Sequence, residues 1–202
     1  MFGYIFSIVF SYLVGSIPSG LIIGKGIWGI DLRDYGSHNI GATNAWRTIG
    51  KKAGLFIFIC DFLKGAIGVL IARELVGTPT AMVLGGIMAI VGHSLSIFLG
   101  FKGGKGVATG LGVIAMLMPS VTLLVFLIWF LIVKATGYVS LSSIIAAVFV
   151  PILAFFFAEP TAYIIFGIFA AVLIVVRHKS NINRLLNGTE SKIKAGSINK
   201  LK

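Results

Sequence analysis

The segment from Phe101 to Thr109, with the sequence FKGGKGVAT, combines lysines and glycines in a pattern suited to binding an anion. Glycines allow the backbone to turn so that successive N–H groups point at one position, and lysines add positive charge. If Val107 begins a helix, the free N–H groups of its first turn face the same position. We therefore predict a phosphate site that comprises Lys102, Gly103, Gly104, Lys105, Gly106 and Thr109.

The same segment would also suit a basic turn at the cytoplasmic edge of a membrane, with no ligand. It is not the phosphate loop of nucleotide hydrolases, because no Gly-Lys-Ser or Gly-Lys-Thr follows at the required spacing. ATP held with magnesium is therefore not the predicted anion.

A second polar segment, residues 25–52, is centred on GSHNIGATNAWR at 36–47. The Arg47 guanidinium suits a phosphate, which it can hold through two parallel hydrogen bonds. A solvated connecting loop would have a similar composition, but a loop of this length is more often functional than idle. We expect the small polar side chains before Arg47 to bind phosphate or hydroxyl oxygens: Ser37, Asn39, Thr43 and Asn44.

Asp61 and Lys64 lie one helical turn apart inside an apolar run. Ionisable groups at such a depth are costly and are usually paired. We expect an ion pair near the site, which either orients neighbouring loops or contacts the substrate directly. Membrane phosphatidyl-alcohol transferases bind divalent metal with clustered aspartates, and Lys64 occupies a position where a second aspartate would be needed, so no metal site is predicted.

Histidines and serines occur beside the polar segments. His93 precedes the glycine-rich segment, and a structural role for it is as plausible as a functional one. His178 follows the last apolar run, and Asn181 lies one turn later, while Ser140 and Ser143 are one turn apart at the start of another run. We predict that Ser143, His178 and Asn181 are the catalytic group and that they orient a substrate. No His-x4-Asp pair, the dyad of the familiar glycerolipid acyltransferases, follows any histidine.

The composition identifies an integral membrane protein: 57% of the residues are hydrophobic, 11% are charged, and the mean hydropathy is +1.03. The first apolar run has no preceding basic residue and no Ala-x-Ala site, so it is expected to be a retained span. The single cysteine, Cys60, is expected only to pack against its neighbours.

We predict one all-α membrane domain over 1–202, with a basic tail at 177–202 and apolar runs at roughly 4–24, 53–73, 80–99, 107–118, 120–133, 140–158 and 160–176.

The charge distribution predicts the topology. With seven transmembrane helices and the N-terminus outside, every Lys and Arg except Lys64 and Arg73 falls in a cytoplasmic segment. Merging the two short runs that meet at Pro119 would place Lys134 and the basic tail outside. That arrangement would contradict the positive-inside rule, by which Lys and Arg concentrate in cytoplasmic loops. The net charge of +11 therefore reflects topology, and no nucleic-acid partner is predicted.

The 107–118 run covers only about 18 Å of a ~30 Å hydrocarbon core, so the glycine-rich segment is expected to lie in a recess.

Four motifs occur in the order expected for a known family: GSIPSG at 15–20, GSHNIGATNAWR at 36–47, DFLKG at 61–65 and HSLSIFLGFKGGKGVATGLG at 93–112. Over nearly the whole chain, the sequence resembles the bacterial acyl-phosphate:glycerol-3-phosphate acyltransferases. Two departures are His38, where the family commonly has glycine, and Gly137, where an arginine often precedes the tyrosine.

The resemblance implies that a fatty acyl group passes from acyl phosphate, and not from acyl-CoA or acyl carrier protein, to the sn-1 hydroxyl of glycerol 3-phosphate. The products would be lysophosphatidic acid and inorganic phosphate, in the first step of phospholipid synthesis. The resemblance also implies a multi-pass protein of the bacterial inner membrane whose active site faces the cytoplasm and needs no cofactor and no dedicated protein base.

The main alternative is a transporter or channel for a phosphorylated organic anion, which would share the helix N-terminus site and the intramembrane ion pair. An alternating-access carrier needs gating contacts on both membrane faces. Here the polar segments all fall on one predicted face, and the outer connections are nearly featureless. We therefore favour the enzyme over the transporter.

Overall fold

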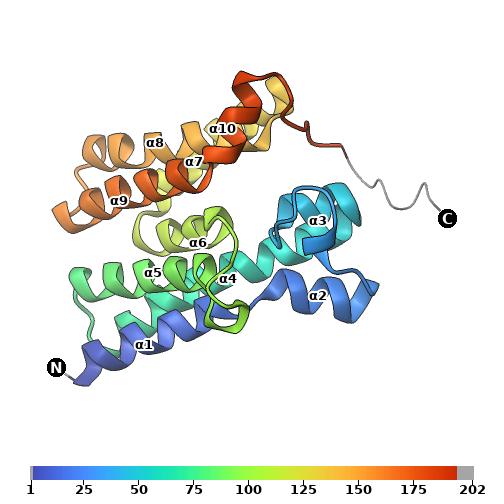
Figure 1. Cartoon of the computed structure of the whole chain (residues 1–202). Coiled ribbons are helices and arrows are strands. Elements are labelled where there is room, and N and C mark those ends of the chain that lie inside the picture. The colour runs from blue at the N-terminus through green and yellow to red at the C-terminus, as the bar shows by residue number, and fades with distance from the viewer. Residues whose placement is uncertain (1, 195–202) are drawn as a thin grey trace.

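The computed structural model describes residues 2–194 (Figure 1), and this part of the chain contains helices and no strands, as predicted. The α-helices are α1 (Phe2–Ser16), α2 (Ser19–Trp28), α3 (Ala42–Thr48), α4 (Lys51–Leu75), α5 (Pro79–Ser94), α6 (Val107–Leu117), α7 (Pro119–Thr136), α8 (Val139–Phe156), α9 (Thr161–Arg177) and α10 (Lys179–Leu186). Two short 3-10 helices are η1 (Leu32–Asp34) and η2 (Ile97–Leu99).

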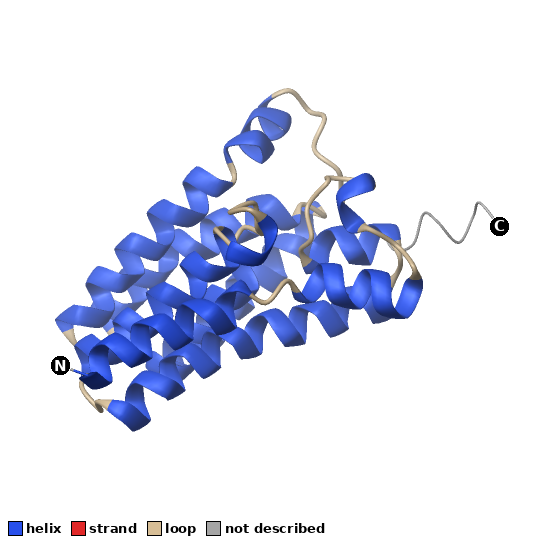
Figure 2. Ribbon diagram, turned by 60° about the horizontal axis from the view of Figure 1, so that its bottom comes forward, coloured by secondary structure: helices blue, strands red, loops and turns tan. Residues whose placement is uncertain are grey.

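The helices form two packed groups (Figures 1 and 2). In the first, α4 packs against α1, α5, α6 and the short α3. In the second, α8 packs against both α7 and α9. The groups meet where α5 contacts α9 and α6 contacts α7, around a core that includes Val113, Met118 and Phe166.

Glycines allow α4 and α6 to approach very closely. A Cβ at Gly65 would lie 1.9 Å from the carbonyl oxygen of Thr109, and one at Gly112 would lie 1.9 Å from that of Phe62. Small residues at helix contacts permit such backbone approach in membrane proteins. The start of α6 is therefore fixed against α4.

Within residues 2–194, five helical stretches are long and apolar enough to span a membrane, or six if the bent pair α9 and α10 forms one span. Helix α6, with 11 residues, is shorter than a span. An integral membrane protein is therefore supported, whereas seven spans and the orientation of the termini stay predictions.

The first apolar run lies in one candidate span, Phe2–Trp28, as predicted, but it is not one continuous helix. It breaks after α1 and resumes as α2, because Pro18 lacks an N–H for a helical hydrogen bond. Residues 25–52 contain the end of α2, all of η1 and α3, and the start of α4.

Polar segments that are distant in sequence come together at one end of the helices. Lys105 reaches Asn181 at 2.6 Å, and Arg47 donates to the carbonyl oxygen of Ser191 at 2.5 Å. The N-terminal end of α1 lies elsewhere, where Tyr4 bonds to Thr78 at 2.9 Å in the turn between α4 and α5 (Figure 1). The helices thus bring the polar segments into one site.

Candidate active site

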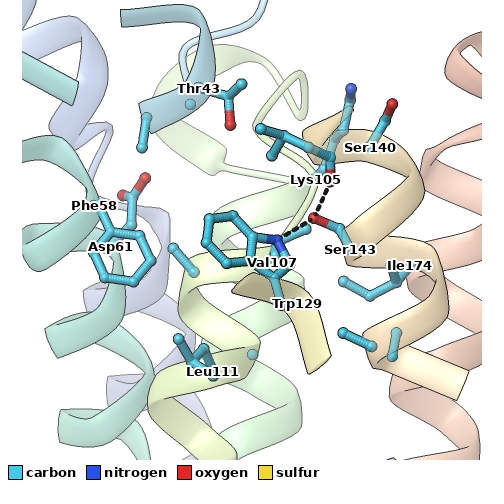
Figure 3. A pocket seen from close by; sticks show the side chains of 18 of the residues that line it. Thr43, Phe58, Asp61, Lys105, Val107, Leu111, Trp129, Ser140, Ser143 and Ile174 are labelled. Carbon is cyan, nitrogen blue, oxygen red and sulfur yellow. Dashed lines mark hydrogen bonds between the residues drawn. The ribbon is translucent and has the colours of Figure 1, made fainter. Parts of the chain in front are cut away.

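A cavity of about 420 Å³ opens between the two helix groups (Figure 3). One part is polar and is lined by Ser37, Asn39, Thr43, Asn44, Arg47, Asp61, His93, Lys105, Ser140, Ser143, His178, Asn181 and Glu190. The rest is apolar and is lined mainly by Phe58, Leu111, Ile114, Val125, Phe126, Trp129, Ala146, Val150 and Ala170. Polar groups and an apolar groove therefore share one cavity.

The glycine-rich loop binds helix α5 through its own backbone. The N–H of Gly103 donates to the carbonyl oxygen of Ser94 at 3.1 Å, and the N–H of Gly104 donates to that of His93 at 3.0 Å. Arg177 donates to the Gly104 carbonyl oxygen at 2.8 Å. Contrary to the prediction, these two glycine N–H groups hold the loop in place and are not available to a ligand.

The free donors lie instead at the start of α6. Gly106, Val107 and Ala108 line the cavity, and their N–H groups have no acceptor among the described residues. Gly106 has φ of +83°, a conformation that favours glycine. The dipole of α6 adds partial positive charge at the same place, so this helix N-terminus is a candidate anion site.

Two other residues of the predicted phosphate set do not line the cavity. Lys102 is exposed outside it, and the Thr109 side chain is fully buried. The side chain of Thr109 therefore supports helix packing and does not contact a ligand in the cavity.

Lys105 belongs to a buried polar network. Its ammonium donates to Asn181 Oδ1 at 2.6 Å, and Asn181 Nδ2 donates to Glu190 Oε1 at 2.7 Å. Ser140 Oγ and Arg184 Nε also donate to the Glu190 carboxylate, at 2.8 and 2.7 Å. Asn181 therefore links Lys105 to Glu190, and its second Nδ2 hydrogen is left for a ligand, so its predicted role in orienting the acceptor stays a prediction.

The network affects the charge of its members. Burial lowers the pKa of Lys105 to about 8, although the nearby Glu190 carboxylate acts in the opposite direction. Burial alone would raise the pKa of Glu190, but its hydrogen bonds from Asn181, Ser140 and Arg184 outweigh this and lower it. The ammonium of Lys105, which is partly buried, therefore loses its proton more readily than that of an exposed lysine.

Ser143 and His178 face the same cavity from α8 and the end of α9. Ser143 Oγ donates to the carbonyl oxygen of Val139 at 2.8 Å and accepts from Trp129 Nε1 at 3.2 Å (Figure 3). His178 Nδ1 lies 2.8 Å from the carbonyl oxygen of Ile174 and must donate to it, since a carbonyl only accepts. Neutral His178 therefore offers Nε2 as an acceptor, which suits a substrate hydroxyl.

Asn44 has a structural role that the sequence did not indicate. Its Nδ2 donates to the carbonyl oxygens of Leu32, Tyr35 and Asn39, at 2.8–3.0 Å. Its Oδ1 accepts from the N–H of Ser37 at 3.0 Å. Asn44 therefore organises the loop that carries Ser37 and Asn39, and its amide has no hydrogen left for a substrate.

Ser37 and Thr43 remain candidates for direct contact, since both line the cavity and neither hydroxyl has a hydrogen-bond partner among the described residues. Arg47 also lines the cavity and is tied to Ser191 after α10. The Asn39 side chain caps its own turn by accepting from the N–H of Gly41 at 2.9 Å.

The predicted ion pair within α4 forms, with Lys64 Nζ 2.7 Å from Asp61 Oδ1 and both side chains buried. Asp61 lines the cavity, whereas Lys64 lies behind it. Within residues 2–194, no three His, Cys, Asp or Glu side chains converge in a manner that would hold a metal ion.

Sequence reasoning missed Glu190, which lies in the loop after α10. The available signal was that Glu190 is the one acidic residue of the otherwise basic 177–202 tail. Nothing in the sequence indicated that Trp129 belongs to the site, because it lies within an apolar run of α7.

The matching family and the similar proteins of known sequence carry the same name. The family described as glycerol-3-phosphate acyltransferase matches residues 5–188. The glycerol-3-phosphate acyltransferase of Fusobacterium nucleatum is 47% identical over 93% of this chain and 96% of its own length. The enzyme of the same name from Aquifex aeolicus is 45% identical over 92% and 97%, respectively.

Two solved structures share the fold. Both are crystal structures of PlsY (YgiH), an integral membrane glycerol 3-phosphate acyltransferase. The glycerol 3-phosphate form has a TM-score of 0.90 and 44% identity, and covers 95% of this chain and 96% of that one. The lysophosphatidic acid form has a TM-score of 0.87 and 43% identity, with 94% of each chain covered.

Proposed function

The chain belongs to the glycerol-3-phosphate acyltransferase family, and we propose that its acyl donor is a fatty acyl phosphate. It is an acyltransferase, and its acceptor is glycerol 3-phosphate. The products would be sn-1 lysophosphatidic acid and inorganic phosphate. The competing prediction of anion transport is set aside, because the relatives and solved structures described above are named as acyltransferases.

The observation that carries this proposal is a single cavity in which phosphate-binding groups adjoin an apolar groove. A fatty acyl phosphate has the same two parts, an anionic head and an apolar chain. The head would lie near the start of α6, and the chain would lie along Phe58, Leu111 and Val150.

Two groups of anion ligands line this cavity, as a reaction between two phosphate compounds requires. The first comprises the N–H groups at the start of α6, with Ser37 and Thr43 from the 36–47 segment. The second comprises the cations Lys105 and Arg47. A thioester donor would carry no phosphate at its reactive carbonyl and would use only one of these groups.

In the proposed reaction, the sn-1 hydroxyl oxygen attacks the acyl carbonyl carbon, and the bond from that carbon to the phosphate oxygen breaks. Phosphate leaves with the electron pair, and the hydroxyl proton passes to a phosphate oxygen of the donor. Orientation of two reactants supplies roughly 7–11 kcal/mol in well-arranged systems, and positive groups stabilise the leaving phosphate. His178 Nε2 and Ser143 would orient the glycerol hydroxyls.

We further propose that the polar end of the molecule faces the cytoplasm in a bacterial inner membrane, with seven passes and the N-terminus outside. The gathering of the basic segments at that end supports this orientation through the positive-inside rule. Glycerol 3-phosphate would then enter the site from the cytoplasm, and the fatty acyl phosphate from the cytoplasmic leaflet.

The test is an assay of the purified protein with labelled glycerol 3-phosphate, given palmitoyl phosphate in one arm and palmitoyl-CoA in the other. We expect equal amounts of lysophosphatidic acid and inorganic phosphate with palmitoyl phosphate only. Product with palmitoyl-CoA alone would refute the proposed donor. The variant His38→Asn serves as a control that should keep wild-type activity. His38 lies outside the cavity, and its φ of 55° suits asparagine.

A further inference from the structure

A buried charged cluster lies behind the glycine-rich loop. The Lys64 ammonium donates to the Ile17 carbonyl oxygen at 2.8 Å and to His93 Nδ1 at 3.2 Å, and it forms an ion pair with Asp61, whose Oδ1 lies 2.7 Å away. The side chains of Lys64, Asp61 and His93 are 7%, 4% and 5% exposed.

The cluster determines which nitrogen of His93 carries the proton. An ammonium has no lone pair, so His93 Nδ1 must accept in its contact with Lys64. The proton of the neutral imidazole is then on Nε2, because the partner of one ring nitrogen decides the state of the other. His93 thus presents an N–H donor on the side away from Lys64.

The Nε2 atom lies against the glycine-rich loop. A Cβ on Gly104 would be 2.1 Å from His93 Nε2, so the ring packs directly on this glycine. His93 also lines the cavity, and its Nε2 has no hydrogen-bond partner among the described residues. Because this N–H faces the cavity and has no acceptor among the described residues, it is available to donate to a ligand bound there.

We propose that His93 Nε2–H donates a hydrogen bond to a phosphate oxygen of a bound substrate. In this arrangement Asp61 and Lys64 are positioning residues, which act on the substrate only through the imidazole. A phosphate oxygen is the expected acceptor because the free N–H groups at the start of α6 line the same cavity. This inference rests on the proposed function, since it requires a phosphate substrate.

Two amide substitutions separate contact with substrate from simple packing. In His93→Gln, the side-chain amide reaches approximately the position of Nε2 and retains a donor there. In His93→Asn, the amide reaches the position of Nδ1 and retains only the acceptor for Lys64. We expect His93→Asn to lower kcat/KM roughly 10- to 100-fold, as for a lost hydrogen bond to a charged group, and His93→Gln to recover much of this.

The control is again His38→Asn, which is expected to have wild-type rates. Each variant is first compared with wild type by size-exclusion chromatography and thermal unfolding, so that kinetics are read only on folded protein. A rise in KM for palmitoyl phosphate assigns the contact to the donor, and a rise in KM for glycerol 3-phosphate assigns it to the acceptor. The inference is overturned if folded His93→Asn matches wild type, or if His93→Gln loses as much as His93→Asn.

A spectroscopic measurement tests the tautomer independently of activity. The chain has three histidines, so ¹⁵N-histidine labelling gives few signals, and His38→Asn and His93→Asn assign two of them. We expect His93 to be protonated on Nε2, and the double variant Asp61→Asn/Lys64→Met to give a mixture of tautomers. Protonation of His93 on Nδ1 in the wild type would overturn the inference.

These results are distinguishable from failure of the proposed function. If wild-type protein makes no product from palmitoyl phosphate, the donor assignment fails before any variant is considered. If wild-type protein is active and His93→Asn is unaffected, the donor assignment stands and only the role of His93 is wrong.

Discussion

The lowered pKa of Lys105 predicts a specific pH dependence of the reaction. Lys105 is buried beside Asn181, and the cations Arg184, Arg47 and Arg177 lie near enough to oppose its charge. These effects bring its pKa from 10.5 to about 8 in the protein without substrate. Only the ammonium form attracts phosphate, so kcat/KM should change little near pH 7 and should fall above pH 8, approaching tenfold per pH unit.

Two substitutions give the expected magnitudes. Lys105→Ala removes a hydrogen bond to a charged group, which is worth about 1.5–3 kcal/mol, or roughly a 10- to 150-fold loss of kcat/KM. Lys105→Arg keeps its charge at all accessible pH values. It should therefore remove the alkaline fall, even if its different shape lowers the rate overall.

The assay measures initial rates of lysophosphatidic acid formation between about pH 6 and 10, at constant ionic strength and at several glycerol 3-phosphate concentrations. The second pKa of a phosphate ester is near 6, so the substrate charge is constant across the alkaline range. The reasoning is wrong if kcat/KM shows no fall between pH 7 and 10, or if the same fall persists in Lys105→Arg.

Three further predictions concern the loop, the acceptor site and the topology. Gly104→Val should reduce activity at least as much as Lys105→Ala, because a Cβ at this position would lie 2.1 Å from the His93 ring; near-normal rates would show that the loop only connects two helices. His178→Asn should keep measurable turnover and chiefly raise the KM for glycerol 3-phosphate, by the equivalent of about 0.5–1.5 kcal/mol. If kcat instead falls 10²–10⁴-fold and one limb of the pH profile disappears, His178 is a general base. Cysteines introduced at positions 42 and 190 should be labelled from the same, cytoplasmic face, and labelling from opposite faces would contradict the proposed orientation.

The sequence by itself determined the helical class, the approximate positions of the apolar helices and the polar segments that line the candidate site. These properties are local, because hydropathy over a run of residues decides whether a helix can enter a membrane. The same local character explains the prediction of the ion pair between Asp61 and Lys64, which lie one turn apart on a single helix. The helical break at Pro18 was equally readable from the missing N–H of proline, although we did not use that signal.

Only the tertiary structure decided what each polar group does. Hydrogen-bond partners came from distant parts of the chain: Lys105 meets Asn181, 76 residues later, and Lys64 meets the carbonyl oxygen of Ile17, 47 residues earlier. For this reason the sequence placed the phosphate donors on Gly103 and Gly104, whose N–H groups instead bind the end of α5.

The two cavity histidines give the clearest example. In sequence, His93 and His178 differ only in position. In the structure, Lys64 leaves His93 with a donor at Nε2, whereas the Ile174 carbonyl leaves His178 with an acceptor at Nε2. The protonation state of an imidazole nitrogen depends on the group that packing places against its other nitrogen, and that packing is a property of the whole fold.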